Sequence, residues 1–481
     1  MSGKKNYPLL AAALFLLIQM SQAKVIHNYR FSPTDDPKPG LAGNGITDIQ
    51  KGNSVLWLGT GHGLSRAVDN GQSFESFEGV EGVGRGSIAG LWVSGDSIWI
   101  STAVDTFSQA VGQVVDMGTG LSVSTDGGAT WKHFPQPGPT PFQNLSYDIA
   151  VHQGNVWITS FGGGLQKSAN WGETWEVVPP DERVFNPGSN LNHRAFSVIS
   201  AMGALWVGTA GGVNKSTDGG QTWTNFNHTN QQQPISGNFI VALAHQQYKT
   251  RNIIWAASWK AEGESEFYAV SKSEDGGLSW QTTLHDERPH NFAFDDSVVY
   301  VAADGGLFKS TDFGETWYVF PTIEDRVRGE IIATMDYYSA LGENGTLWIG
   351  SADGLARTSD NGYTFDVFRA FQSTAQSDEP RTYAYPNPFS PIRHNQIGQD
   401  GFVRFQYNTL KSTQVTIKVY DFAMDLVKAV LDNESKPGPG DFTALWNGRN
   451  EFGDAVANGV YFYSVELDGD GTYWGKVMIV N

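Results

Sequence analysis

The sequence predicts an all-β protein, a seven-bladed β-propeller followed by a small Ig-like β-sandwich. Three observations predict this architecture. The composition favours strands and tight turns, one sequence unit returns seven times, and the pattern changes over the last hundred residues. The repeat spacing of roughly 45–50 residues is typical of a four-stranded propeller blade.

The composition favours strands over helices and narrows the classes of partner. Aromatic residues make up 13% of the chain and glycine occurs 56 times, which favours many short strands joined by tight turns. The 481 residues exceed one ordinary domain. Cysteine is absent, which excludes disulfides, thiol catalysis and cysteine-ligated metals. The formal charge of −18 disfavours nucleic acid and anionic membranes as partners, and no motif calls for a cofactor.

The first 23 residues are expected to form an export signal. Lys4 and Lys5 precede an apolar run over residues 9–20, and Ser21, Gln22 and Ala23 provide the small-residue cleavage site. The alternative is an uncleaved membrane anchor, although the run is short for a membrane span. No other run is long and apolar enough to cross a membrane. We therefore expect a secreted or outer-membrane surface protein.

Seven units of the same design occupy the propeller, which is predicted over residues 24–371. Each unit contains an apolar strand that has a central Trp, or a Tyr in one copy. A turn, a short strand and an eight-residue motif follow. In the fourth unit the strands are expected at residues 195–199, 205–209, 213–216 and 222–226. The motifs, called octets below, begin at Ala67, Ser124, Ser168, Ser216, Ser273, Ser310 and Thr358.

The octets resemble the Asp-box of bacterial neuraminidase repeats, S-x-D-x-G-x-T-W. Two copies depart from it, with Ala67 in place of Ser and Asn170 in place of Asp. The acid is expected to accept backbone N–H bonds, the Gly to take a positive φ, and the final aromatic residue to pack between blades. Repetition argues for a structural role, and a calcium loop would need more oxygen ligands. The structural acids are Asp69, Asp126, Asn170, Asp218, Asp275, Asp312 and Asp360.

Loop lengths indicate which rim of the propeller binds a ligand. Strands in a blade alternate direction, so all octets lie on one rim, together with the turns between the first and second strands. The extended turns at residues 103–120 and 259–266 and the long connections at residues 135–143, 179–193 and 228–237 fall on the opposite rim. Long loops on a rigid scaffold commonly hold binding sites. We expect an extracellular protein or glycan to bind on the rim opposite the octets.

An Asn or Arg is expected just before each innermost strand, at the mouth of the central channel. Such a ring would suit an anionic or carbohydrate-like ligand, or an acidic patch on a partner. Trp259, Phe107 and Phe161 would add stacking surface. The alternative is that the Asn residues cap turns and the Arg residues are solvated. The ring consists of Asn44, Arg85, Asn144, Arg194, Asn238, Asn291 and Arg328.

Catalysis is a second hypothesis, in the form of an extracellular glycoside hydrolase that uses carboxylates on that rim. A sialidase resemblance would require six blades and an Arg-Ile-Pro-type segment, which the sequence lacks before the first octet. Xyloglucan-cleaving hydrolases carry paired acids between tandem propellers, whereas one propeller fits here. No nucleophile elbow, zinc motif or phosphate loop occurs, so we assign no catalytic residue and no metal. A third hypothesis is an assembly factor, since single propellers of photosystem assembly factors are similar.

A polar linker is expected over residues 372–382 and an Ig-like sandwich over residues 383–481. This segment resembles the Ig-like domain of flagellar hook-cap proteins and the C-terminal type A sorting domain of the type IX secretion system. The resemblance implies recognition by that translocon and surface attachment. The alternative is a permanent accessory domain, and Phe422-Ala423-Met424 departs from the expected glycine turn. The matching residues are Tyr385–Phe389, Val419–Asp421, Trp446–Asn450, Gly459–Tyr463 and Gly475–Val477.

Overall fold

The computed structural model describes residues 37–480 except 109–111, 140–143, 182, 262, 264 and 375–380. The expected signal peptide, residues 1–23, lies outside the described residues, as does most of the expected linker. Residues Thr34–Asn481 group into one compact unit. Strands and turns make up nearly all of the described chain, with two short 3-10 helices, η1 (Asp69–Gly71) and η2 (Leu191–His193).

Seven antiparallel sheets, six of four strands and one of five, form the blades of a propeller, which confirms the predicted fold. The first strand of each blade is the inner strand, and β1 (Lys38–Pro39) extends the outer edge of blade one. In blade four the inner strand and its three neighbours lie within two residues of the predicted strand bounds. The blades, in chain order, are β2 (Ile46–Gly52), β3 (Val55–Thr60), β4 (Gly63–Val68), β5 (Ser73–Ser76); β6 (Ser87–Ser94), β7 (Ser97–Ser108), β8 (Gln113–Ser124), β9 (Lys132–Phe134); β10 (Ser146–His152), β11 (Asn155–Ser160), β12 (Gly164–Ser168), β13 (Glu176–Val177); β14 (Ala195–Ala201), β15 (Ala204–Thr209), β16 (Gly212–Ser216), β17 (Thr224–Phe226); β18 (Phe239–Tyr248), β19 (Arg251–Trp259), β20 (Ala269–Ser273), β21 (Gln281–Thr283); β22 (Pro289–Asp295), β23 (Val298–Ala303), β24 (Gly306–Ser310), β25 (Tyr318–Val319); and β28 (Tyr337–Glu343), β29 (Thr346–Ser351), β30 (Gly354–Thr358), β31 (Asp366–Phe368).

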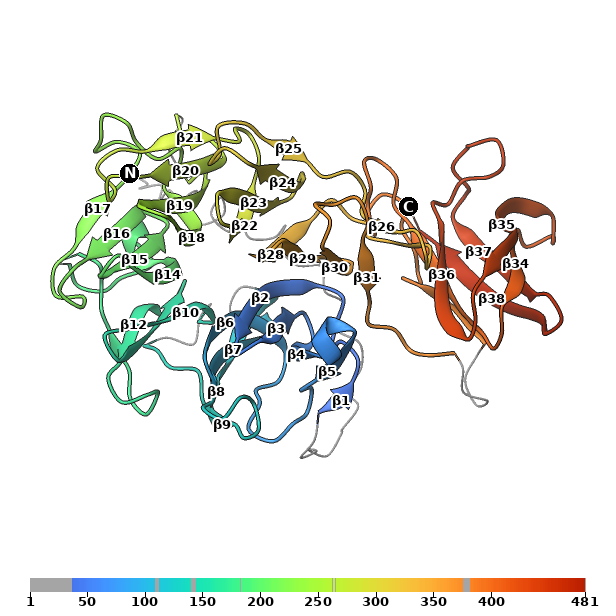
Figure 1. The fold of residues 1–481 in the computed structure, drawn as a ribbon, viewed down its shortest axis with the longest axis horizontal. Helices are drawn as coiled ribbons and strands as arrows, with labels where there is room; N and C mark the ends of the chain where they lie inside the picture. Colours follow the sequence, from blue (N-terminus) through green and yellow to red (C-terminus); the bar gives the residue numbers. More distant parts are fainter. Residues whose placement is uncertain are drawn as a thin grey trace, which may run out of the picture. The chain divides into compact units, whose positions relative to one another are not determined.

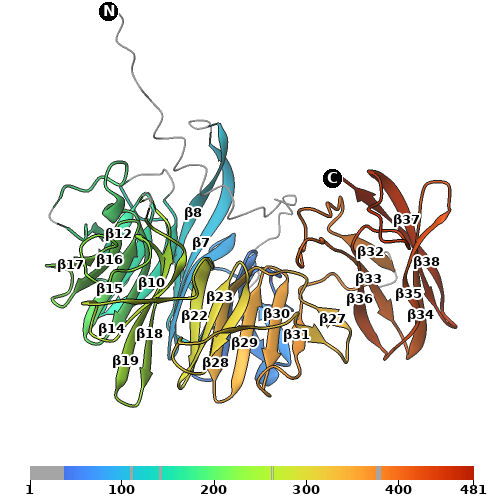
Figure 2. The ribbon, with the colours of Figure 1, turned by 90° about the horizontal axis from the view of Figure 1, so that it is seen from above.

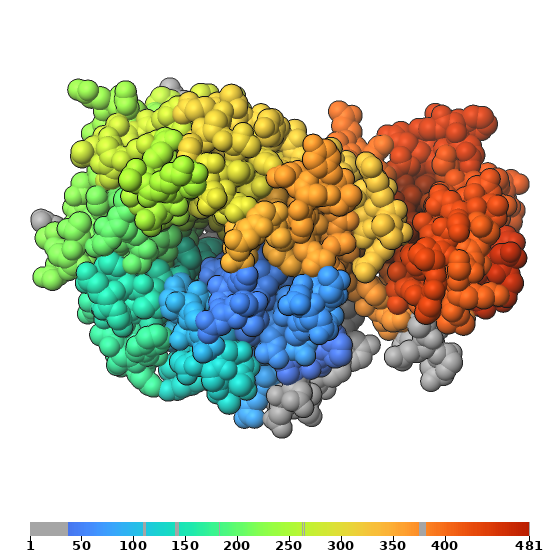
Figure 3. All heavy atoms as spheres, viewed as in Figure 1, coloured from blue at the N-terminus to red at the C-terminus, as the bar shows by residue number. Residues whose placement is uncertain are grey.

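The inner strands contact one another in a closed ring, β2–β6–β10–β14–β18–β22–β28 and back to β2 (Figure 1). The first and last blades share no sheet, so side chains close the ring. Asn44 and the backbone of Ala370 exchange two hydrogen bonds, of 2.9 and 2.6 Å. The rings of Phe74 and Phe368 meet edge to face at 5.0 Å between centroids. Figure 3 shows atoms of blade one (blue) directly beside those of blade seven (orange).

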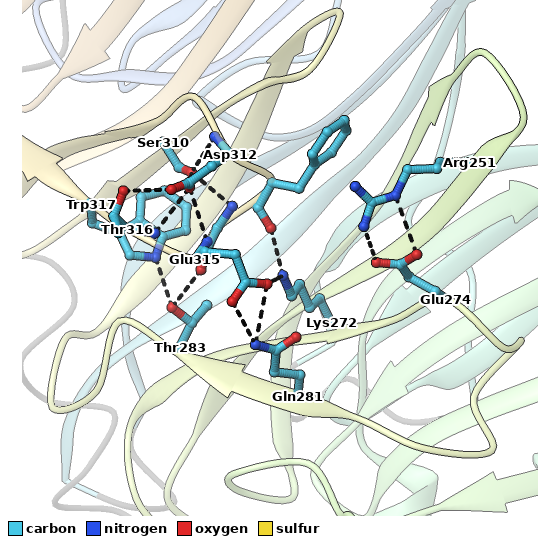
Figure 4. A network of polar contacts seen from close by, with 12 residues as sticks. Arg251, Lys272, Glu274, Gln281, Thr283, Ser310, Asp312, Glu315, Thr316 and Trp317 are labelled. Carbon is cyan, nitrogen blue, oxygen red and sulfur yellow. Dashed lines mark hydrogen bonds and ion pairs between the residues drawn. The ribbon is translucent and has the colours of Figure 1, made fainter.

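Each octet folds into a turn that its own side chains saturate with hydrogen bonds. In blade four, the Ser216 hydroxyl donates to Asp218 at 2.8 Å and accepts from the Gly220 N–H at 2.8 Å. The Asp218 carboxylate also accepts from the N–H and the hydroxyl of Thr222, and these bonds lower its pKa. In blade six, Lys272 of the preceding blade contacts Glu315 within the turn (Figure 4).

The octet that carries Asn170 keeps the same turn with one bond reversed. Asn170 Oδ1 still accepts from the Ser168 hydroxyl at 3.0 Å and from the Thr174 N–H at 2.9 Å. Its Nδ2 donates to the Thr174 hydroxyl at 2.9 Å, where the other octets have a hydroxyl donating to a carboxylate. The amide therefore replaces the acid without loss of the fold.

The octet glycine packs against the large aromatic residue of the preceding blade. Gly220 has φ +91°, and a Cβ at this position would lie 2.6 Å from Cη2 of Trp157. The same relation joins Gly128 to Trp57 and Gly314 to Trp255. Trp57, Trp157 and Trp255 are 1% exposed or less, so the octet of one blade covers the tryptophan of the blade before it.

The C-terminal residues form the predicted β-sandwich. One sheet has the order β32 (Thr382–Tyr385), β33 (Val403–Thr409) and β36 (Gly440–Trp446). The other has the order β35 (Leu426–Lys436), β34 (Thr413–Tyr420), β37 (Gly459–Leu467) and β38 (Gly471–Ile479). A separate apolar core, with Phe405, Tyr463 and Trp446 among its members, joins the two sheets. Strand β35 was not among the predicted strands.

Two segments depart from the regular pattern of four-stranded blades. The insertion at residues 103–120 continues β7 and β8 beyond the neighbouring strands on the rim opposite the octets (Figure 2). Between blades six and seven, β26 (Glu324–Asp325) and β27 (Glu330–Ile331) form an extra hairpin. The inner strand of blade seven therefore begins only at Tyr337. The predicted position of Arg328, just before that strand, is wrong because Arg328 lies in this hairpin.

We expect Gly220→Ala to destabilise the propeller far more than Gly203→Ala in the same blade. Both glycines have a positive φ, but a Cβ at Gly203 meets nothing within 4 Å. Gly203→Ala should cost about 1 kcal/mol from the backbone conformation alone. Gly220→Ala should cost about 1–3 kcal/mol more, because the methyl group overlaps Trp157. Chemical denaturation measures both, and equal costs would contradict the packing role of the octet glycine.

Candidate functional site

Every inner strand has a β-bulge close to its start. In blade three, Ser146 pairs with Ser160 and Asp148 with Thr159, so Tyr147 is an extra, unpaired residue between them. The same shift occurs in all seven inner strands. Bulges re-aim side chains and often lie next to functional sites. The extra residues are Thr47, Ala89, Tyr147, Phe196, Val241, His290 and Tyr338.

The bulge residues of blades three, four, six and seven, together with Phe239 and Trp259 of blade five, form a continuous arc of aromatic side chains on the rim opposite the octets. Tyr147 and Phe196 have ring centroids 5.4 Å apart, and Phe196 meets Phe239 edge to face at 4.4 Å. Beyond Phe239 the arc continues through Trp259 and His290 to Tyr338 in contacts of 5.6–5.8 Å. We call these six residues the aromatic arc. Because the inner strands surround the axis, the arc lines one side of the channel mouth.

A polar cluster supports the blade-six part of the arc. His290 Nε2 lies 2.5 Å from Asp304 Oδ1, and the Arg288 guanidinium lies 3.2 Å from Asp304 Oδ2. Arg288 also lies over the Trp259 ring at 4.4 Å, within cation–π distance. Burial opposes ionisation of Asp304, but the hydrogen bond with His290 and the charge of Arg288 lower its pKa. The cluster thus keeps a carboxylate and a fixed positive charge beside the aromatic surface.

Below the arc, the residue after the bulge is an aspartate in blades one and three, namely Asp48 and Asp148. Asp148 accepts hydrogen bonds from the Ser197 hydroxyl and the Val198 N–H of the next blade, both at 2.9 Å. Burial raises the pKa of Asp48 to about 7, with a smaller effect from Asp148, and burial raises that of Asp148 to about 6.

The projecting hairpin of β7 and β8 stands beside the Tyr147 end of the arc. Its exposed face includes Phe107 and Val114, which pair across the hairpin and are 62% and 61% exposed. Asp105 and Asp116 also pair directly across it. Burial, with the hydrogen bond to Asp105, raises the pKa of Asp116 to about 6. The charge of Asp116 in turn adds to the burial that raises the pKa of Tyr147.

Five of the seven predicted ring residues lie one or two positions before an inner strand, as expected, namely Asn44, Arg85, Asn144, Arg194 and Asn238. Most of their side chains bond within the protein. Asn144 bonds to the Pro137 carbonyl and the Ser160 hydroxyl, and Asn238 bonds to Glu266. The Arg194 guanidinium bonds to the Pro187 carbonyl at 2.6 Å and lies over the Phe161 ring. Arg85 is exposed.

The other two predicted ring residues lie elsewhere. Asn291 is the third residue of β22 and occupies the position after the bulge, level with Asp48 and Asp148. Arg328 is exposed in the β26–β27 hairpin, 3.9 Å from Asp325. The seven residues therefore do not form one ring at one level of the channel.

Of the three predicted stacking residues, Phe107 is exposed on the hairpin, Phe161 is half-buried, and Trp259 is 1% exposed. Trp259 belongs to the aromatic arc but supports Phe239 and His290 from below. Phe239 was not predicted from the sequence, and neither were the bulge residues Tyr147, Phe196 and Tyr338. The neighbouring residues could have identified the three bulge residues. Each stands between the first residue of an inner strand and a small polar residue, as in Ser146-Tyr147-Asp148 and Ala195-Phe196-Ser197.

No family model matches the chain. The xyloglucanase Xgh74A of Acetivibrio thermocellus is 29% identical over 207 residues, which cover 36% of this chain and 24% of that protein. The chain thus spans only a quarter of the length of this relative. The photosystem II assembly lipoprotein Ycf48 of Synechococcus sp. is 24% identical over 263 residues, covering 51% of this chain and 69% of that protein.

The crystal structure of a GH74 enzyme from Niastella koreensis resembles this fold with a TM-score of 0.50 at 13% identity. The match covers 92% of this chain and 75% of that one. This likeness supports the propeller fold. Within the described part of the chain, no helix is long and apolar enough to cross a membrane. The same residues contain no group of three or more His, Asp or Glu side chains placed to hold a metal ion.

We expect the free energy of unfolding of Asp48→Asn, relative to that of the natural protein, to increase from low to high pH. The unfolded chain ionises Asp48 near its ordinary pKa, whereas the folded chain does so only near pH 7. Folding therefore favours the protonated acid, and the free energy of unfolding of the natural protein falls as the pH rises between these values. Unfolding free energies measured at about pH 5 and about pH 8 should show the variant gaining roughly 2 kcal/mol on the natural protein.

Asp126→Asn is the control for this pH effect. Hydrogen bonds from Thr130 lower the pKa of Asp126 to about 2, so its carboxylate is charged throughout the same interval. The stability difference between this variant and the natural protein should stay constant between the two pH values. A constant difference for Asp48→Asn as well would contradict the raised pKa of Asp48.

Proposed function

We propose that the chain is an exported, non-catalytic binding protein, whose ligand, a glycan or an extended protein segment, binds at the channel mouth on the rim opposite the octets. The observation that carries this proposal is the aromatic arc. Its half-buried members Tyr147, Phe239, His290 and Tyr338 come from four different blades and form one surface. Aromatic rings beside a few fixed polar groups are typical of small-molecule and peptide sites.

The blade-six cluster offers charged groups for hydrogen bonding at the surface. Asp304 is held by His290 and Arg288, which keep it charged. A glycosidase pairs such a carboxylate with an acid of raised pKa, and burial together with the charge of Asp304 raises the pKa of Asp336 and Glu287 nearby, so the hydrolase hypothesis needs its own test. The relatives suggest two classes of ligand. The name of one states action on xyloglucan, and the name of the other states assembly of a photosystem. Arrays of extracellular glycans and of peptides therefore test both classes.

The first test measures binding by the full chain after array screening has found a ligand. Phe239→Ala should weaken the affinity about 30-fold, because truncation of a central aromatic contact costs about 2 kcal/mol. The matched control is Tyr363→Ala, since Tyr363 is 81% exposed on the octet rim and should leave the affinity unchanged. Calorimetry measures both dissociation constants. Equal affinities for the natural protein and Phe239→Ala would contradict a site at the arc.

The hydrolase hypothesis has its own test on the same hits. Every glycan that binds is incubated with the natural protein, and newly formed reducing ends are measured. We expect none. Release that disappears in Asp304→Asn would overturn the non-catalytic proposal and assign the rim to a hydrolase.

We further propose that the sandwich directs export through the type IX secretion system. The support is the order of the matching segments, from Tyr385–Phe389 to Gly475–Val477, along strands of a complete sandwich. Deletion of residues 383–481 should trap the protein in the periplasm of a host that has this system. Cell fractionation measures the distribution, with Phe452→Ala as an intact-domain control, since Phe452 is 91% exposed and lies outside the matching segments. Normal surface delivery of the deleted form would contradict the sorting role.

A further inference from the structure

Blade seven and the sandwich share a buried cluster of charged side chains. The propeller contributes Asp353, Arg369 and Glu330, and the sandwich contributes Arg404 from β33 and Thr443 from β36. We call these five residues the junction cluster. The side chains of Asp353 and Arg404 are each 3% exposed, and that of Arg369 is 7% exposed. Charged residues are almost never buried to this degree without partners, so the surfaces around them fit closely enough to exclude water.

Arg404 is the centre of the contacts between the two domains. Its guanidinium forms an ion pair with Asp353 and donates to the Ile331 carbonyl at 2.5 Å. The same guanidinium lies 3.7 Å from the Glu330 carboxylate. Thr443, on the neighbouring strand of the sandwich, has its hydroxyl 2.9 Å from both Glu330 oxygens. Two strands of the sandwich thus reach three groups of the propeller.

Asp353 is also fixed from the propeller side. The Ala333 N–H donates to its Oδ2 at 2.7 Å, and Arg369 pairs with its Oδ1 at 2.5 Å. Burial opposes its ionisation, yet the charges of Arg369 and Arg404 lower its pKa. The propeller therefore presents an oriented carboxylate at the point where Arg404 arrives. Ion pairs away from water are screened little and are stronger than exposed pairs.

The first residues of the predicted linker lie against the sandwich as well. The Ser373 hydroxyl lies 3.1 Å from Asp441, and Thr374 is 1% exposed. The backbone of Gln372 exchanges two hydrogen bonds of 3.1 Å with the Tyr383 hydroxyl. These contacts add to the junction without using residues 375–380.

We propose that blade seven and the β26–β27 hairpin before it carry a docking surface, centred on Asp353 and Glu330, whose partner is the β32–β33–β36 sheet of the sandwich of the same chain. The sandwich is then a firmly docked module, and it stays bound to the propeller after the linker is cut. This inference is independent of the ligand at the aromatic arc and of the route of export.

The experiment replaces residues 375–380 of the full chain with a protease recognition sequence and cuts it after folding. The two fragments of the natural protein should elute together in size-exclusion chromatography, also in about 1 M salt, because the ion pairs are buried. In Arg404→Met the apparent dissociation constant of the cut fragments should rise at least about 100-fold, since one member of a buried pair is lost. Asp353→Asn tests the same pair from the propeller side.

Arg449→Met is the matched control. Arg449 also pairs with an aspartate, Asp400, but both lie within the sandwich and are 40% and 36% exposed. Its cut fragments should elute together as those of the natural protein do. Circular dichroism before cutting checks that each variant is folded. Separation of the natural fragments, or equally tight association in both junction variants, would overturn the proposal.

Discussion

The fold depends on how seven inner strands meet around one axis without pairing with one another. Each strand has a bulge, and in blades one, two and three the bulge frees a backbone carbonyl that a hydroxyl of an adjacent blade then binds. The Ile46, Ile88 and Ser146 carbonyls, each just before an extra residue, accept from Ser339, Thr47 and Ser101. The same bulge turns the extra side chain toward the channel mouth. The bulge therefore both links neighbouring blades and places side chains at the channel mouth.

The octets impose a second relation between blades. Because the octet glycine has no side chain, the aromatic residue of the preceding blade can lie flat against the turn, and each blade needs its successor to cover it. Where the second strand carries Tyr300 in place of a tryptophan, Phe320 takes over the contact with Gly362. The repeat therefore tolerates a different aromatic residue at this contact, but it does not tolerate a side chain at the octet glycine. The ring closes without a shared strand because blade one covers Trp348 of blade seven in the same way, through Gly71.

The sequence predicted the repeat count, the order of strands and the sandwich, because these depend on local periodicity and on turns. It did not predict the aromatic arc. A bulge shifts the register by one residue, and the side chains that meet in the arc are 20 to 49 positions apart in the sequence, from Phe239 and Trp259 to Tyr147 and Phe196. Two errors have the same local origin. An extra hairpin between β26 and β27 displaced Arg328 from the expected ring, and Asn291 proved to be the residue after a bulge and not the one before a strand. The polar ring was predicted just before the inner strands, whereas the bulge residues of the arc lie at the second position of those strands.

The two rims differ for a physical reason. On the octet rim, the carboxylates of residues such as Asp218 and Asp312 already accept several hydrogen bonds from their own turns, which lower their pKa values and leave little capacity for a ligand. The opposite rim has no such repeated motif, so its turns are free to differ. Blade two extends a hairpin there, blades three to seven supply the aromatic arc, and the turn of blade seven presents Asp353 to the sandwich. The octets fix the fold by using the hydrogen-bonding capacity of the side chains on one rim. Ligand contacts and domain docking can therefore arise on the other rim.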